Sequence, residues 1–193
     1  MRRSQSRLSQ GGLTSAARKT AKRTSRPAQE LERFLDAAVH CGARWALIVR
    51  PADIVTGNWV RWKCQFGCDG YNSSRMCPPH TPTPEQTRRM LDEYRRGILF
   101  EAPRNTTKKI AAKLEREIFL AGYHKALGLG SGPCRLCQTC VCRGECRHPD
   151  EARPAMEACG IDVFATVREH GFTIDVVRSR KDPQHYFGLI LIE

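Results

Sequence analysis

The densest group of chemically reactive side chains is a run of five cysteines within thirteen positions. The segment GPCRLCQTCVCRGECRHP, residues 132–149, contains this run between Cys134 and Cys146. Cys134, Cys137 and Cys140 follow the spacing C-x2-C-x2-C, which puts three thiolates on successive bends of one loop. Together with a later cysteine, this spacing is typical of a loop that wraps a [4Fe–4S] cluster.

We expect Cys146 to supply the fourth thiolate of this cluster. Bacterial ferredoxin loops place their last cysteine nearer and directly before a proline, so the match is partial. Cys142 competes for the position, but its one-residue gap from Cys140 is awkward for two ligands of one centre. Zinc more often takes two separated C-x2-C pairs. The segment therefore favours an iron–sulfur cluster over zinc, with disulfides and free thiols as the remaining alternatives.

A second group of cysteines lies in KCQFGCDGYNSSRMCPPH, residues 63–80. Three thiolates could hold one metal centre that either keeps an open position, where a substrate could bind, or takes a ligand from elsewhere. The alternative is a purely supporting metal, or free thiols that are partly buried. The three cysteines are Cys64, Cys68 and Cys77. The candidates for a fourth ligand are His80, Cys41 and Cys159.

The cysteine distribution and the hydropathy also predict a compartment. None of the N-terminal sequence has the apolar core of a secretory signal, so an oxidising compartment is not indicated. Clustered thiols in a reducing compartment are more often metal ligands than disulfide partners. No apolar run approaches the ~20 residues needed to span a bilayer. We therefore expect a cytoplasmic protein without a membrane partner.

The net charge of +12 is concentrated at one end of the chain. Residues 1–29 hold eight Lys or Arg and no acidic residue, which leaves 24 basic and 20 acidic residues, a net +4, for the other 164 positions. This segment is rich in Ser and Thr and poor in large apolar residues, so we expect a disordered basic tail. A transit peptide is the alternative. Nucleic-acid binding is possible only through this tail, because the remainder is nearly balanced.

The hydrophobic pattern predicts a mixture of helices and strands for the rest of the chain. Helical spacing covers 30–42 and about 106–125, and TPEQTRRMLDEYRRG has a helix start at Thr83–Pro84 and a stop at Gly97. Short helices are expected near 150–159 and 162–170, and GLGSG at 128–132 as a flexible segment. The expected strands are 44–50, 57–64, 98–102, 172–178 and 185–192. This mixture predicts one compact α+β or α/β domain with two cysteine-rich metal-binding loops.

The same segments resemble a family of bacterial and archaeal predicted metal-binding proteins, a domain of unknown function. The resemblance covers residues 30–193 and rests on the C-x3-C pair, CPPHTPTPEQ, FLAGYHKALGLGSGPCRLCQTC and CRHPDEARPAMEACGIDVF. It implies metal bound by cysteines, as an iron–sulfur cluster, and accessory proteins of anaerobic and corrinoid-dependent metabolism. The cysteines that occupy its motif positions are Cys64, Cys68, Cys77, Cys134, Cys137, Cys140 and Cys146.

Together these features predict an iron–sulfur protein that transfers electrons to a partner enzyme or activates it reductively. One [4Fe–4S] cluster would be bound in the second loop, and a second centre in the first. A zinc-stabilised interaction module, whose tail contacts nucleic acid, is the alternative, and a carrier of metal or clusters is a third. No catalytic residue can be assigned, because the chain has no P-loop or dinucleotide-binding motif and no recognisable Ser-His-Asp set. Whether the protein is an enzyme stays open.

Overall fold

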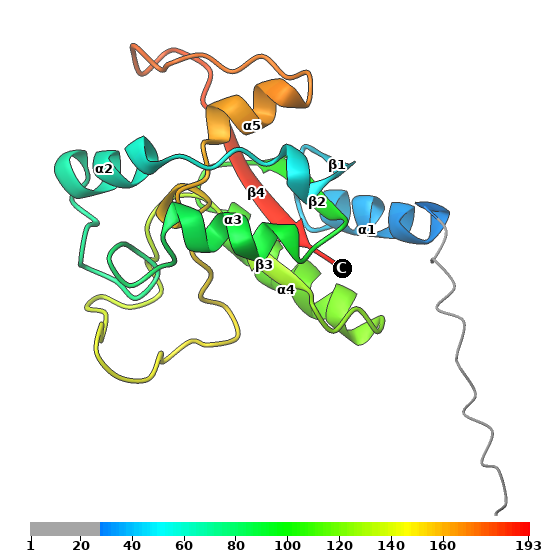
Figure 1. Cartoon of the computed structure of the whole chain (residues 1–193), viewed down its shortest axis with the longest axis horizontal. Coiled ribbons are helices and arrows are strands. Elements are labelled where there is room, and N and C mark those ends of the chain that lie inside the picture. The colour runs from blue at the N-terminus through cyan, green and yellow to red at the C-terminus, as the bar shows by residue number, and fades with distance from the viewer. Residues whose placement is uncertain (1–27) are drawn as a thin grey trace, which may run out of the picture.

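The computed structural model describes residues 28–193, which form a mixed α+β fold (Figure 1). The described part contains an antiparallel sheet of four strands in the order β1-β2-β4-β3, with helices on both faces. The α+β expectation is confirmed. The elements in chain order are α1 Ala28–His40, β1 Trp45–Val49, the 3-10 turn η1 Pro51–Asp53, α2 Asn58–Gly67, α3 Pro84–Asp92, β2 Gly97–Ala102, α4 Thr107–Leu120, β3 Leu127–Leu129, the 3-10 turn η2 Glu157–Cys159, α5 Val163–Glu169 and β4 Tyr186–Leu191.

The central strand β2 is buried along its whole length and separates two hydrophobic cores. Side chains alternate between the faces of a strand, so Ile98 and Phe100 point to one core and Leu99 to the other. The first core is closed by α1 and α4, and the second by α3, α5 and η2. The neighbouring strand contributes Gly188 opposite Phe100, where a side chain would collide with the aromatic ring.

Local signals in the sequence explain the elements that were predicted well. Thr83 caps α3 by accepting from the Gln86 backbone amide at 3.2 Å, and the Gln86 side chain accepts from the Thr83 amide at 2.8 Å. This reciprocal pair satisfies amides that the first helical turn leaves without partners. Pro84 follows the cap and supplies a backbone angle suited to the first turn. The strands at 44–50, 98–102 and 185–192 are also confirmed.

The strand expected at 57–64 is wrong, because this segment forms α2. A short run with few apolar residues fits either type of element. Val60 is the residue of α2 that is buried, and the helix packs on η2. The Gly57 amide, just before α2, bonds the Gly160 carbonyl at 2.9 Å. Tertiary contacts with η2 therefore decide the conformation.

Three further expectations differ from the structure. Residues 172–178 form no strand; the Ile174 carbonyl accepts from the Arg168 side chain at 2.8 Å instead of from a neighbouring strand. The segment 128–132, expected to be flexible, begins within β3, which pairs with β4. Near 150–159 only the short turn η2 forms.

The predicted basic tail, residues 1–29, lies outside the described residues except for Ala28 and Gln29, which belong to α1. Among the described helices, none combines the length and apolar character that a bilayer crossing requires.

Candidate metal centre

The structure brings the four cysteines predicted to bind a cluster to one small pocket. They come from a loop without regular secondary structure, at the lower left of Figure 1 between β3 and η2. Residues 74–76 of the first cysteine loop also line this pocket, as does His148 of the second loop. The thiols that line this pocket are Cys134, Cys137, Cys140 and Cys146.

Several of the sulfur atoms accept hydrogen bonds from backbone amides. The His148 amide donates to Cys146 Sγ at 3.4 Å, and the Gly70 amide donates to Cys68 Sγ at 3.4 Å. The amide of Arg75 bonds the Cys140 sulfur and, as the main cause, lowers the pKa of this thiol. A hydrogen bond to the charged form stabilises a thiolate, which is the form that binds metal. The Arg75 amide therefore favours the thiolate form of Cys140.

The other three cysteines also lie near one another. Cys64 is in the last turns of α2, and Cys68 follows its end. A side chain built at Gly70 would lie 3.4 Å from Cys68 Sγ and 3.7 Å from Cys77 Sγ, so the two sulfurs flank this glycine. Burial raises the pKa of both Cys64 and Cys77, and the charge of the Cys68 thiolate adds to this effect. Without metal, these two thiols are protonated at neutral pH.

The two groups of cysteines adjoin, and a buried cation lies between them. The amide of Cys134 bonds the Cys77 sulfur. Lys108 Nζ is buried without a hydrogen-bond partner among the described residues. Burial lowers the pKa of Lys108, and the charges of Cys134 and Cys77 are the largest effects that raise it. A thiolate-ligated centre carries negative charge, so it would supply the counter-charge that this ammonium lacks.

Glu157 is a second unpartnered polar group near these thiols. Its Oε2 is buried without a hydrogen-bond partner in the described part of the chain. Burial raises the pKa of Glu157, and the charge of Lys108 opposes this effect. Glu157 is close in sequence to the predicted cluster loop, whereas Lys108 falls in an ordinary amphipathic helix and does not stand out in the sequence. No local pattern marks their burial beside the thiols.

The candidates for an additional ligand lie apart from these groups or are otherwise engaged. Cys41 packs at the edge of the core between α1 and the sheet. Cys159 is buried in the second core, and burial raises its pKa to about 12. His80 is exposed, and its Nε2 pairs with Asn72 Oδ1 at 2.9 Å. Cys142 Sγ points to the carbonyls of Asn72 and Cys140, at 3.8 and 3.9 Å, and does not line the pocket.

Within residues 28–193, no three His, Cys, Asp or Glu side chains converge closely enough to hold a single metal ion. Zinc holds thiolates about 2.3 Å away, so its ligands must converge on one point. A [4Fe–4S] cluster binds each thiolate at a different iron, and its ligands surround a larger body. The pocket offers four thiols, a donor set that zinc and an iron–sulfur cluster can both use.

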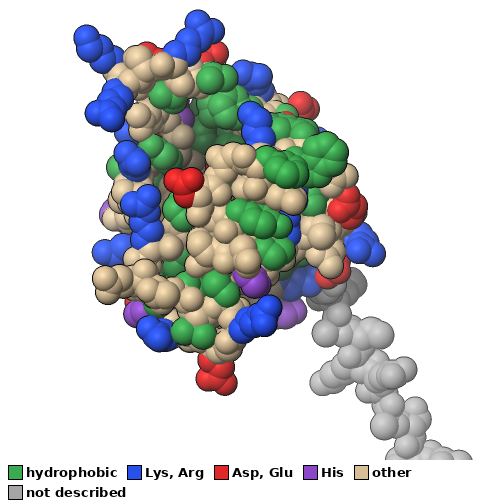
Figure 2. Space-filling model, turned by 90° about the vertical axis from the view of Figure 1, so that its left-hand side faces the viewer, with side chains coloured by type: hydrophobic (Ala, Val, Ile, Leu, Met, Phe, Trp, Pro, Cys, Tyr) green, Lys and Arg blue, Asp and Glu red, His purple; other side chains and the backbone are tan. Residues whose placement is uncertain are grey.

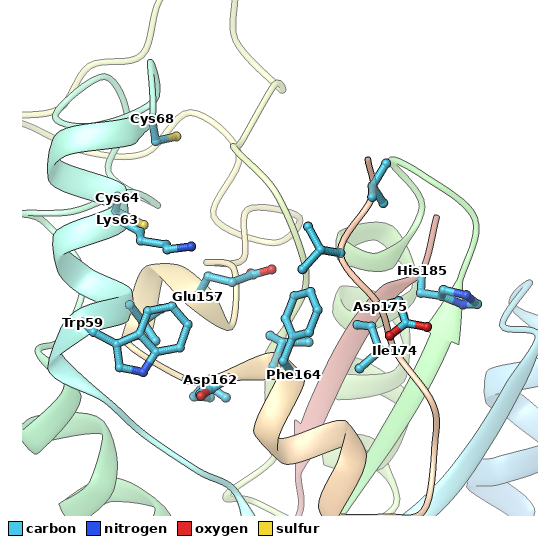
Figure 3. A pocket seen from close by; sticks show the side chains of 15 residues that line it. Trp59, Lys63, Cys64, Cys68, Glu157, Asp162, Phe164, Ile174, Asp175 and His185 are labelled. Carbon is cyan, nitrogen blue, oxygen red and sulfur yellow. The ribbon is translucent and has the colours of Figure 1, made fainter. Parts of the chain in front are cut away.

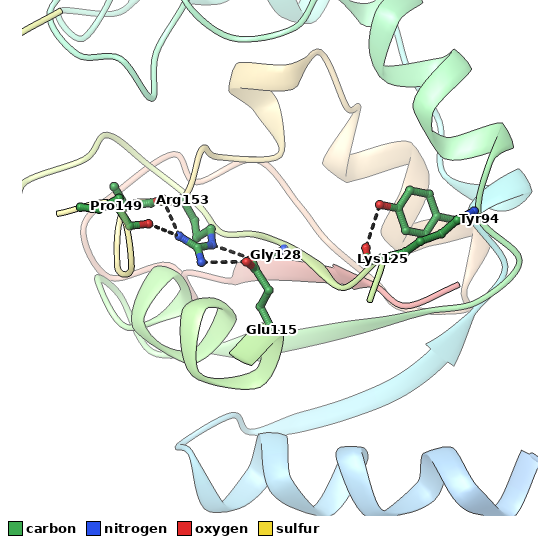
Figure 4. A network of polar contacts seen from close by, with 7 residues as sticks. Tyr94, Glu115, Lys125, Gly128, Pro149 and Arg153 are labelled. Carbon is green, nitrogen blue, oxygen red and sulfur yellow. Dashed lines mark hydrogen bonds and ion pairs between the residues drawn. The ribbon is translucent and has the colours of Figure 1, made fainter. Parts of the chain in front are cut away.

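Both ends of the second cysteine loop are held by Glu115 of α4 (Figure 4). Before the loop, the Gly128 amide donates to Glu115 Oε2 at 2.7 Å. After it, Arg153 donates to both carboxylate oxygens at 2.6 and 2.8 Å, and to the Pro149 carbonyl at 3.0 Å. Such bidentate pairs fix geometry as well as charge. The loop therefore starts and ends at one rigid point on a helix.

The first cysteine loop is fixed to η2 by side chains that donate to backbone carbonyls. Arg61 of α2 donates to the carbonyls of Pro82 and Ala158, at 2.9 and 3.1 Å. Thr81 also donates to the Ala158 carbonyl, at 2.5 Å, and Thr87 to that of Cys159, at 2.6 Å. These long-range bonds position Cys64 and Cys77 on a common support, and no local sequence pattern predicts them.

A hollow of about 490 Å³ opens beside the first group of cysteines (Figure 3). Cys64 and Cys68 lie at one end, and Trp59 and Phe164 form side walls. The Lys63 side chain reaches into it, with Nζ 5.5 Å from the centre of the Trp59 ring. The wall of the hollow is mostly apolar. The hollow extends from the two cysteines to the exposed surface of α2.

The thiols of Cys140 and Cys142 should react differently with an alkylating agent. Their pKa values are shifted in opposite directions: the Arg75 amide lowers that of Cys140, while burial and then the Cys140 charge raise that of Cys142. Since the thiolate reacts, we expect Cys140 of the reduced, metal-free chain to react with iodoacetamide at lower pH than Cys142. Mass spectrometry of peptides labelled across a pH series measures this. Equal profiles would contradict the assigned hydrogen bond.

The model of one protein family matches residues 47–192, and its description is predicted metal-binding protein (DUF2284). No curated protein and no solved structure matches the chain significantly. Because the family match covers most of the sequence and both cysteine groups, the chain belongs to this family.

Proposed function

We propose that this member of the predicted metal-binding family is an iron–sulfur protein that transfers electrons to a partner enzyme or activates it reductively. The observation that carries the proposal is the pocket lined by Cys134, Cys137, Cys140 and Cys146. These residues would hold a [4Fe–4S] cluster, which supplies one-electron transfer when bound. Cys64, Cys68 and Cys77 would hold a second centre.

The surroundings of the pocket support a redox role over a purely structural one. All four thiols are only partly buried, so a partner can approach the cluster closely. Amide bonds to the Cys140 and Cys146 sulfurs and the nearby Lys108 ammonium stabilise added negative charge. Such groups raise the reduction potential of a cluster. This is the chemistry that electron transfer needs.

We expect the protein to work in a reducing compartment such as the cytoplasm. All ten cysteines are free thiols, including the exposed Cys68. Thiols of this kind persist where glutathione and thioredoxin keep them reduced. The redox partner would be a protein or enzyme that docks at the partly buried cluster thiols.

Electron paramagnetic resonance of the anaerobically purified full chain tests the redox proposal. We expect dithionite to produce an iron–sulfur signal that a mild oxidant removes and a second reduction restores. Cys41→Ser is the matched control, because this thiol lies away from both groups, and its signal should equal that of the wild type. A protein that binds only zinc, or a cluster lost in the first cycle, would contradict the proposal.

A further inference from the structure

Three large aromatic side chains are exposed on a single face of α2. Trp59 is 48 % exposed, Trp62 65 % and Phe66 79 %. Their spacing of three and four residues puts them on one side of the helix, here called the α2 aromatic face. Figure 2 looks at the side of the molecule that carries α2 and shows hydrophobic side chains gathered there. Val176 and Val177 are also exposed, on the opposite wall of the hollow beside Trp59.

The size of this surface matches the apolar part of a protein interface. Aromatic side chains bury about 150–250 Å² each, so these exposed fractions leave about 300–450 Å² of aromatic surface. A standard interface covers about 800 Å² per partner, of which somewhat more than half is apolar. The two valines add to the aromatic surface. One copy of the chain therefore offers about what one side of a stable dimer needs.

The surface around the α2 aromatic face has both projecting side chains and hollows. Trp62 and Phe66 protrude, while an open groove lies along the face and the deeper hollow adjoins it at Trp59. A two-fold interface is self-complementary, so projections and hollows must lie on the same patch.

We propose that the α2 aromatic face pairs with the same face of a second copy of this chain, forming a homodimer. In an antiparallel pairing about an axis near Trp62, Phe66 of one copy lies against the hollow beside Trp59 of the other. The pairing also covers Cys68, which is exposed in the single chain.

Sedimentation velocity of the full chain, in a dilution series, tests this inference. We expect the wild type to be a dimer, and Trp62→Glu or Phe66→Glu to raise the dissociation constant about 30-fold or more, as loss of an aromatic hot spot does. Leu120→Glu is the matched control, because Leu120 is 67 % exposed at the end of α4. It should stay dimeric. Circular dichroism checks that each variant is folded.

A wild type that is monomeric at all concentrations would overturn the dimer. If that monomer bound phosphatidylserine vesicles through Trp62 and Phe66, the face would be a membrane contact, and the dimer would be equally excluded. Dimeric Trp62→Glu and Phe66→Glu variants would show that another surface pairs. Iron and sulfide content are measured on the same samples, and they should not change in the variants. A failure of the iron–sulfur proposal is thus seen separately from a failure of the dimer.

Discussion

Replacing Cys137 with Ser is expected to bleach the protein. Cys137 is the middle cysteine of C-x2-C-x2-C and lines the pocket with the other three thiols. Removing one of four thiolates leaves an iron without a protein ligand, and oxygen-sensitive clusters are then lost. We expect Cys137→Ser, purified without oxygen, to lose most of the visible absorbance and most of the iron of this centre. Absorbance spectroscopy and iron analysis measure both.

Cys142→Ser is the matched control, since Cys142 lies in the same loop and is also a partly buried thiol. Its sulfur points to the carbonyls of Asn72 and Cys140 and does not line the pocket. We expect its spectrum and iron content to equal those of the wild type. If Cys142→Ser bleaches the protein and Cys146→Ser does not, the fourth thiolate has been assigned to the wrong cysteine.

Arg153→Ala is expected to lower the free energy of unfolding by about 3–5 kcal/mol, because it leaves a poorly solvated carboxylate without its partner. The side chains of Arg153 and Glu115 are only 13 % and 18 % exposed. Since this pair holds both ends of the second cysteine loop, we also expect weaker cluster retention. Urea unfolding, followed by circular dichroism on metal-free reduced protein, measures the stability without the contribution of the metal.

Arg50→Ala provides the comparison for this change. Arg50 forms a bidentate bond to Asp53 at 2.8 and 2.9 Å, but its side chain is 78 % exposed. Exposed ion pairs contribute little to stability, because water and salt screen them, so we expect a much smaller loss than from Arg153→Ala. Equal losses from Arg50→Ala and Arg153→Ala would refute the role given to the buried pair.

The parts of the fold that were predicted from the sequence depend on local signals. The start of α3 is encoded by Thr83, Pro84 and Gln86, which lie within four positions of one another. Strand β2 contains the apolar run 98–100, as expected of a strand that is buried on both faces. The helix α2 was missed because its conformation depends on contacts with η2, about 100 residues later in the sequence.

The candidate site follows the same division between local and distant signals. Cysteine spacing is local, so the grouping of Cys134, Cys137, Cys140 and Cys146 could be expected before the structure. Other segments supply the rest of the site. These are residues 74–76, which also line the pocket, the cation Lys108, and Glu115, which binds both ends of the loop. The sequence does not show that these groups lie close together in the fold. Every amphipathic helix, such as α4, has charged side chains, so those of α4 do not stand out.

Iron and acid-labile sulfide, measured per chain on protein purified without oxygen, test the central claim most directly. An iron–sulfur protein with one cluster in the second loop should be brown and contain about four irons and four sulfides per chain, with more iron if the first loop is also loaded. A colourless protein with stoichiometric zinc and no sulfide would contradict the account.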